Sequence, residues 1–141
     1  MNVRGADTDD AAPIASLLCE LGYETSVDVA RDRVNRALQM PHRVLYVAEI
    51  DGDIAGLIEV AEVEAIEHDP RAEIRALVVS EEARGRGVGS ALVRAGEAWA
   101  HRRGLTAMRV RSNIKRERAR LFYEKNGYRV SKTSLAFDKE L

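Results

Sequence analysis

The sequence predicts an α/β fold in a single domain over residues 1–141, with one mixed, mostly antiparallel sheet and helices on both of its faces. Three observations predict it. Apolar residues recur at helical spacing over 14–21. Two apolar segments meet at Asp51-Gly52, which is a hairpin signal. A glycine-rich turn at 84–89 separates an apolar run from a helical pattern. The predicted element order is β-α-α-β-β-β-α-β-α-β-β.

The N-terminal part is predicted to contain a short strand and two helices. The strand covers Asn2–Ala6, and Thr8 is expected to cap the first helix. Gly22 ends that helix, and Ser26 caps a second one that continues to about Leu38. The apolar stripe of the first helix consists of Ile14, Leu17, Leu18 and Leu21.

The middle of the chain is predicted to form three strands. Val44–Ile50 and Ile54–Ala61 form a hairpin around the Asp-Gly pair. The polar residues 62–71 are expected to make a long turn or uneven strand ends. A fourth strand follows over Ala72–Val79. The remaining predicted elements are a helix over Gly87–Arg103, a strand over Thr106–Ser112, a helix over Arg116–Asn126, and closing strands over Tyr128–Val130 and Ser134–Phe137.

Composition limits the classes of function. The chain is 45% hydrophobic and 32% charged, with a formal net charge of −1, so no broad basic surface for nucleic acid or an anionic membrane is expected. No apolar run is long enough to span a bilayer, and Asp7, Asp9 and Asp10 interrupt any signal peptide. The single cysteine, Cys19, is expected to be buried in the first helix and fits a reducing cytoplasm. No metal site is predicted.

The turn at 84–89 reads Arg-Gly-Arg-Gly-Val-Gly and opens a helix, where backbone N–H groups and the helix dipole favour an anion such as phosphate. A P-loop would need lysine and then serine or threonine after its last glycine, whereas Ser90 and Ala91 follow here. A dinucleotide-binding turn would need an acidic residue about 20 positions later, and the stretch around Arg109 has none.

Arg84, Gly87 and Gly89 instead match R-x-x-G-x-G, which resembles the acetyl-CoA turn of the GCN5-related N-acetyltransferases. The approach from Leu77 to Arg84 is similar to that family's strand-to-turn segment. Ser112-Asn113, followed by Ala119 to Tyr128, resembles its second signature. The resemblance covers essentially the whole chain. It implies an acetyl-CoA-dependent N-acetyltransferase, with acetyl-CoA as acyl-donor co-substrate held along the fourth strand where the fifth separates from it.

The resemblance also implies roles for individual residues. Tyr123 would be the general acid that protonates the leaving thiolate, and Glu73 a base acting through water; Glu59 and His68 are alternatives to Glu73. Asn113 would bond near the cofactor, although it also suits a turn before the fourth helix. Packing in the core is the alternative for Tyr123. The expected cofactor-binding residues are Leu77, Val78, Val79, Arg84, Gly85, Arg86, Gly87, Val88, Gly89, Ser90 and Asn113.

The acceptor is predicted to be a primary amine of a small molecule. Relatives that acetylate protein N-termini typically carry glutamate where this chain has Arg109, and an arginine there would repel a cationic amine. A protein N-terminus or a lysine remains the alternative acceptor. A non-catalytic acyl-CoA-binding module is an alternative of another class. The sequence leaves open whether the chain forms a homodimer.

Overall fold

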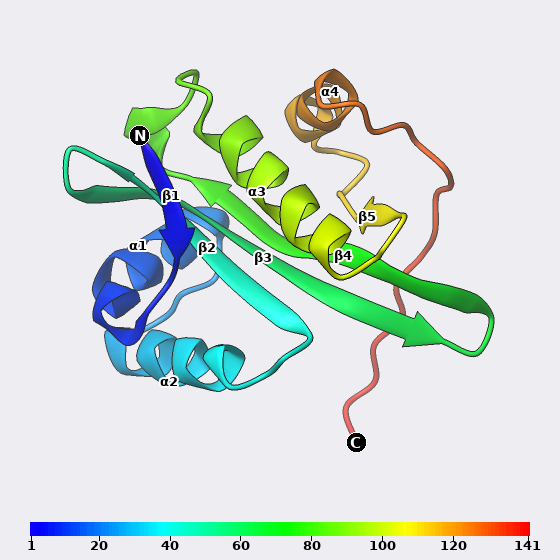
Figure 1. Cartoon of the computed structure of the whole chain (residues 1–141), viewed down its shortest axis with the longest axis horizontal. Helices are drawn as coiled ribbons and strands as arrows, with labels where there is room; N and C mark the ends of the chain where they lie inside the picture. Colours follow the sequence, from blue (N-terminus) through cyan, green and yellow to red (C-terminus); the bar gives the residue numbers. More distant parts are fainter. The chain divides into compact units, whose positions relative to one another are not determined.

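Five strands form one sheet in the computed structural model, which describes all 141 residues (Figure 1). Adjacent strands from β1 to β4 are antiparallel, and β5 lies parallel to β4. The mixed, mostly antiparallel sheet predicted from the sequence is therefore confirmed. The strands are β1 (Asn2–Gly5), β2 (Arg43–Ile50), β3 (Asp53–Ala65), β4 (His68–Val79) and β5 (Met108–Val110).

Helices cover both faces of this sheet (Figure 1). Helices α1 (Ala11–Leu21) and α2 (Val27–Leu38) pack on one face, and α3 (Val88–Arg102) packs on the other. Alternation along β3 divides the two cores, because Leu57 joins the α1–α2 core whereas Val60 faces Gly96 of α3. The buried residues of the α1–α2 core are Ala6, Ile14, Ala15, Leu17, Ala30, Val34, Ala37, Leu45, Val47, Leu57 and Val78.

Short polar motifs set the first helices. Asp7, rather than Thr8, caps a 3-10 turn over Thr8–Asp10 that leads into α1, because its carboxylate accepts from the Asp9 N–H at 2.7 Å. The Asp10 carboxylate accepts in return from the Asp7 N–H at 2.9 Å, which completes a capping box. Ser26 caps α2 as predicted, accepting from Val29 at 3.2 Å.

The hairpins partly match the prediction. Asp51 and Gly52 both have positive φ, 52° and 85°, which confirms the predicted tight turn. Of the two alternatives for 62–71, the long turn is wrong and the uneven strand ends are present, since β3 continues to Ala65, β4 begins at His68 and their register shifts between Val63 and Ala65. These polar strand ends are held by pairing between β3 and β4. Such pairing cannot be inferred from the polarity of the segment alone.

The chain divides into two compact units, Met1–Val110 and Arg111–Leu141. The second contains α4 (Glu117–Lys125), close to the predicted helix. The predicted closing strands are wrong: Tyr128–Val130 and Ser134–Phe137 lie in a segment without regular secondary structure. A strand needs a partner edge, and the apolar side chains here are exposed, among them Leu135 (80%) and Phe137 (88%).

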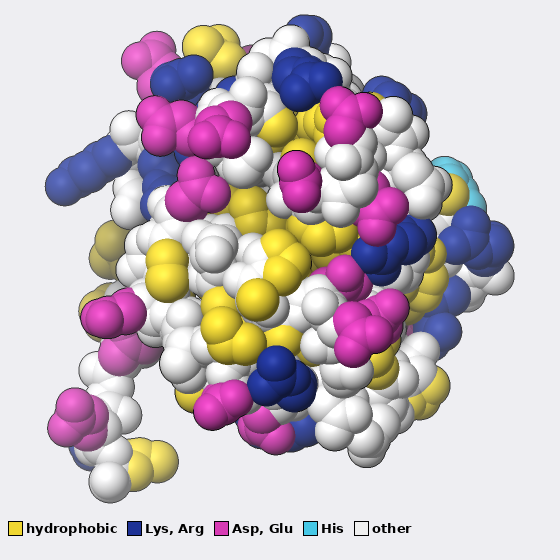
Figure 2. Space-filling view, turned by 90° about the vertical axis from the view of Figure 1, so that its left-hand side faces the viewer, with side chains coloured by type: hydrophobic (Ala, Val, Ile, Leu, Met, Phe, Trp, Pro, Cys, Tyr) yellow, Lys and Arg dark blue, Asp and Glu magenta, His cyan; other side chains and the backbone are white.

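The surface is mixed in character. Figure 2 shows acidic and basic side chains interspersed around hydrophobic ones on one face, in keeping with the net charge of −1. The expected burial of Cys19 is wrong: the residue is exposed, with its Sγ 3.7 Å from the Thr25 carbonyl oxygen. It follows the buried stripe of α1 rather than belonging to it. None of the helices is both long and apolar enough to span a bilayer.

Candidate active site

The turn before α3 presents an open helix N-terminus. Gly85 and Gly87 have φ of +78° and +81°, a region that side chains other than glycine seldom adopt. Gly87 is the N-cap of α3, and no side chain caps the helix. The first helical bond runs from the Ala91 N–H to the Gly87 carbonyl at 3.1 Å. The N–H groups of Val88, Gly89 and Ser90 therefore have no partner within the helix.

Two arginines accompany this N-terminus. Arg84 and Arg86 are exposed, and neither side chain makes a hydrogen bond or an ion pair. The helix dipole and the uncapped N–H groups add partial positive charge at the same place. The turn is thus suited to an anion such as a pyrophosphate, which is the group that the sequence motif implies.

Close packing holds this turn beside the end of β4. Val88 at the start of α3 is 1% exposed. A Cβ at Gly56 of β3 would lie 3.0 Å from Val88 Cγ1 and 2.9 Å from Leu92 Cδ1. Gly56 is the register partner of Val79, the last residue of β4. Gly56 is not among the site residues predicted from the sequence, although a glycine inside a strand signals such a close approach.

The edge of β4 beside the turn has no neighbouring strand. Pairing with β5 covers only Ala72 to Ile74. Next comes a bulge at Arg75, since the adjacent β3 residues Val60 and Glu59 pair with Ile74 and Ala76 and leave Arg75 without a register partner. The Ser80 N–H donates to Ala55 of β3 at 2.8 Å, so alternation directs the backbone groups of Leu77 and Val79 toward the free edge. Val78, 5% exposed, belongs to the core. This edge can pair with an amide-bearing chain.

Glu73 lies on β4 just before the bulge, and its side chain is only 6% exposed. Its Oε2 atom is 3.6 Å from Arg71 Nε, and its Oε1 atom is 3.7 Å from Arg75 Nη1. Both distances are too long for a hydrogen bond but short enough for strong charge attraction at a buried position. The predicted base is therefore a carboxylate held between two guanidinium groups.

The two alternative bases differ from Glu73 in their surroundings. Glu59 is engaged by Arg43, whose Nε donates to Oε2 at 2.8 Å. His68 begins β4 at the tip of the hairpin, and its Nδ1 lies 2.7 Å from the Asp69 carbonyl oxygen. His68 lies away from the bulge, whereas Glu59 pairs with Ala76 directly beside it, but the Glu59 carboxylate is already bonded by Arg43. The geometry favours Glu73 over both.

The second unit contains Tyr123 and Asn113. Tyr123 lies on α4 and contacts the rings of Phe122 and Tyr128 edge to face, with centroids 5.1 Å and 5.8 Å away. Burial raises the pKa of its phenol above the usual value of about 10, so the hydroxyl keeps its proton at neutral pH. Asn113 acts in a turn: its Oδ1 accepts from the Lys115 N–H at 2.9 Å.

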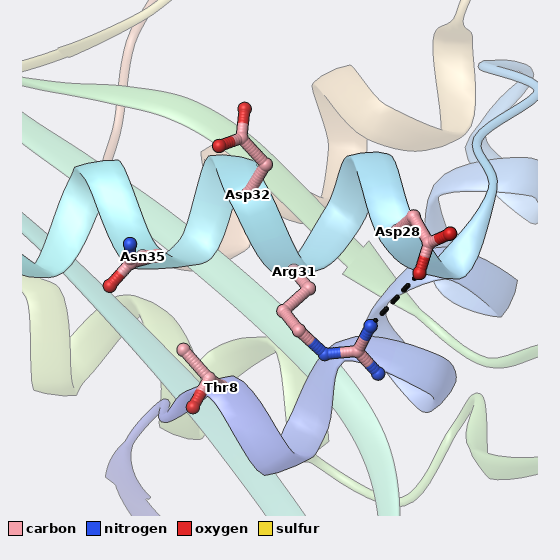
Figure 3. A pocket seen from close by; sticks show the side chains of 5 residues that line it. All are labelled: Thr8, Asp28, Arg31, Asp32 and Asn35. Atoms are coloured by element: carbon pink, nitrogen blue, oxygen red, sulfur yellow. Dashed lines mark hydrogen bonds and ion pairs between the residues drawn. The ribbon is translucent and has the colours of Figure 1, made fainter.

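A hollow between α2 and the 3-10 turn is bordered by Thr8, Asp28, Arg31, Asp32 and Asn35 (Figure 3). Asp28 is bonded by Arg31 at 3.0 Å along the helix, and Asp32 by Arg36 at 3.0 Å. These are solvated pairs on a helix surface, where each contributes little energy. None of the site residues predicted from the sequence borders this hollow.

Comparison with known proteins identifies the class. A sequence model of the acetyltransferase (GNAT) family matches residues 13–128, and the chain belongs to this family. The expected fold, the enzyme class of N-acetyltransferase and acetyl-CoA as acetyl donor are thereby confirmed.

Individual relatives agree with this assignment. The chain is 31% identical over 131 residues to an aminoalkylphosphonate N-acetyltransferase of Salmonella typhimurium, covering 92% of this chain and 85% of that protein. It shares its fold with the aminoglycoside 6'-N-acetyltransferase AAC(6')-Ih of Acinetobacter baumannii (TM-score 0.87, 19% identity, 99% and 98% of the chains). It also shares its fold with AAC(6')-Iy in complex with CoA (TM-score 0.88, 17% identity, 99% and 95%).

Proposed function

We propose that this N-acetyltransferase acetylates a primary amine of a small molecule. The observation that carries the donor half of this proposal is the uncapped start of α3 beside the free edge of β4. The uncapped N–H groups and Arg84 and Arg86 would hold the pyrophosphate of acetyl-CoA. Leu77 and Val79 would pair with the amide groups of its pantetheine arm and so align the thioester. The turn has open space for the pyrophosphate, because a Cβ at Gly85 or Gly87 would meet no atom within 4 Å.

The acceptor half of the proposal draws on the relatives. The Salmonella protein is named for an aminoalkylphosphonate and the two solved structures for aminoglycosides. Both are small amines. Arg109 lies beside Glu73 in the register of β4 and β5, which disfavours a strongly cationic protein segment as acceptor.

Two residues of the chain would move protons. When bound, acetyl-CoA supplies an acetyl group whose C–S bond breaks as the C–N bond to the acceptor forms. Glu73 would take the proton that the amine loses, directly or through water, and Tyr123 would give a proton to the departing sulfur. The raised pKa of Tyr123 keeps this donor protonated. Asn113 is assigned to cofactor binding by its motif alone.

The donor site is tested by Gly87→Val, with Gly104→Val as matched control. The two glycines lie at opposite ends of α3, have φ of +81° and +76°, and are both surrounded by open space. Both variants should lose about 1–2 kcal/mol of folding free energy through the same backbone strain. Only Gly87→Val should weaken acetyl-CoA binding, by at least about tenfold in calorimetry. Equal affinities in the two folded variants would refute the assignment.

The acceptor class is tested by turnover. Free thiol release is followed with acetyl-CoA and a panel of small amines, and peptides with a free N-terminus or a lysine run alongside. Mass spectrometry then identifies the acetylated product. Acetylation of small amines supports the proposal. Exclusive acetylation of peptides points instead to a protein acetyltransferase, and binding without any turnover to an acyl-CoA-binding module.

A further inference from the structure

A row of charged side chains crosses the sheet on the face opposite α3. Register pairing aligns Arg43 of β2 with Ala61 of β3, Ala61 with Glu73 of β4, and Glu73 with Arg109 of β5. Val60 faces α3, so alternation places Ala61 and its partners on the other face. Neighbouring strands lie about 4.8 Å apart, so the row is about 14 Å long. Ala61 lies between Arg43 and Glu73, and its small side chain leaves space above the sheet at that point.

Two more arginines flank Glu73 along β4. Arg71 precedes it by two residues on the same face, and Arg75 follows at the bulge, with their guanidinium nitrogens 3.6 Å and 3.7 Å from the carboxylate. We call this group the arginine cluster. It has four arginines and two glutamates: Arg43, Arg71, Arg75, Arg109, Glu59 and Glu73. The cluster therefore carries two more positive than negative charges.

Part of the hydrogen-bonding capacity of these arginines is not satisfied within the protein. The Nε atom of Arg71 is buried and donates no hydrogen bond. The Arg109 side chain is half-buried and makes neither a hydrogen bond nor an ion pair. A buried donor left without an acceptor destabilises the protein. Oxygen atoms of an anionic ligand would remove that destabilisation, and the flat guanidinium group suits the two or three oxygens of a carboxylate or phosphonate.

The cluster lies within reach of the reacting end of the donor site. The free edge of β4 begins at the bulge, and Glu73 and Arg71 precede Arg75 by two and four residues, about 7 Å and 13 Å along the strand. An amine attacking near the bulge would find the Glu73 carboxylate next to it. The rest of a short acceptor would extend toward Arg71 and Arg109. The negative charge of Glu73 and the positive charges of Arg71 and Arg109 are complementary to a small molecule that carries both an amine and an acid.

We infer that the acceptor is a short aminoalkyl acid whose carboxylate or phosphonate is bound by Arg71 and Arg109. This inference rests on the proposed function, since it takes the acetyl group to be presented at the bulge of β4. It divides the small amines into two groups. An acceptor with an acid group gains charge-assisted hydrogen bonds, whereas a polyamine or another polycation is repelled by the net positive charge of the cluster.

Matched acceptors test the inference on the full chain. Aminoalkylphosphonates and aminoalkylcarboxylates with one to three carbons between the groups are compared with ethanolamine and ethylenediamine in the thiol-release assay. At least one acid should exceed ethanolamine by about 30-fold or more in kcat/KM, and ethylenediamine should be the poorest acceptor. A preference for phosphonate or for carboxylate identifies the acid, and either one supports the inference.

Variants locate the effect. Arg109→Gln leaves no charged group unpaired, because Arg109 has no ion pair to lose. This variant should raise KM for the best acid about tenfold. The KM for ethanolamine, the kcat values and the affinity for acetyl-CoA should each change less than about twofold. Arg71→Gln should act in the same direction. Arg31→Gln on the surface of α2 is the control and should change nothing.

Two kinds of result would overturn the inference. One is equal or better turnover of ethanolamine or ethylenediamine than of every acid. The other is an unchanged KM for the acids in Arg109→Gln and in folded Arg71→Gln. Both leave the proposed function standing, because small amines would still be acetylated. Loss of the proposed function would look different: no small amine of any charge would be acetylated.

Discussion

Gly56 of β3 approaches Leu92 of α3 so closely that a methyl group at position 56 would lie 2.9 Å from Leu92 Cδ1. The same methyl group would lie 3.0 Å from Val88 Cγ1 and 3.1 Å from the Val78 carbonyl oxygen. Two of these atoms belong to the first turns of α3, and the third belongs to the backbone of β4. The missing side chain at Gly56 thus lets the helix start rest directly on the sheet beside the end of β4.

Gly56→Ala should therefore weaken both folding and acetyl-CoA binding. The added methyl group must displace α3 from β3, since the β4 backbone cannot easily move, and overpacking of this kind costs about 1–3 kcal/mol. The displaced helix start should raise the Kd for acetyl-CoA several-fold. Urea unfolding and calorimetry measure the two effects.

Gly5→Ala is the matched control for Gly56→Ala. Gly5 also lies in a strand, but a Cβ there would meet nothing within 4 Å. This variant should keep wild-type stability and affinity. If Gly56→Ala behaves like Gly5→Ala, the close approach does not position the binding turn.

Arg84 and Arg86 should contribute to binding through charge. Both side chains are exposed and unpaired, so their attraction to phosphate should be screened by salt. Arg84→Ala should raise the Kd for acetyl-CoA about two- to fivefold at 20 mM salt, and the ratio should approach one at 500 mM. Calorimetry at both salt concentrations measures the ratio, with Arg31→Ala as control. A ratio that does not depend on salt would exclude a charge effect.

The N-terminal ion network should make folding sensitive to acid. Arg4 donates to the nearly buried Asp10 carboxylate at 2.8 Å and 2.9 Å and to Glu49 at 2.7 Å. The hydrogen bonds from Arg4 lower the pKa of Asp10 below its usual value. A lowered carboxyl pKa stabilises the fold above the unfolded-state pKa of about 3.9, and that stability is lost as the pH falls through the folded-state value.

Asp10→Asn should remove this contribution. We expect a loss of about 1.5–3 kcal/mol at pH 7, because a buried charge-assisted network is broken. The variant should also lose less stability than the wild type when the pH falls from 5 to 2. Urea unfolding across this range measures both, and Asp138→Asn in the exposed C-terminal segment is the control. Parallel pH profiles of wild type and Asp10→Asn would rule out Asp10 as the titrating group.

Local patterns predicted most of the fold. The stripe on α1, the Ser26 cap and the Asp51-Gly52 turn depend on residues close in sequence, and all three are present. The sequence left open whether 62–71 forms a turn or strand ends, and it wrongly predicted strands after residue 127. Strand formation there depends on whether a distant edge offers a partner, which polarity along the segment does not encode.

The residues proposed for the site differ in how visible they are in the sequence. The turn at 84–90 carries its own signal, because its glycines and arginines are adjacent in sequence. The arginine cluster has no signal in the local sequence, since only strand register brings Arg43, Arg71 and Arg109 together. The sequence identified Arg109 as unfavourable for a cationic acceptor, and the register adds that it lies beside Glu73.

The last prediction assigns the general-acid role to Tyr123. Tyr123→Phe keeps the ring and its edge-to-face contacts with Phe122 and Tyr128 but removes the proton donor. A positioned acid contributes about 10²–10⁴-fold, or about 3–5 kcal/mol of barrier. The variant should bind acetyl-CoA normally and lose turnover by that factor in single-turnover acetylation of an accepted amine. Because burial raises its pKa, Tyr123 should remain protonated at neutral pH and should not limit the wild-type rate there by deprotonation. Tyr23→Phe, which removes the hydroxyl of an exposed ring, is the control and should stay within about threefold of wild type. If Tyr123→Phe also stays within about threefold, its ring serves packing alone, and solvent or another group protonates the thiolate.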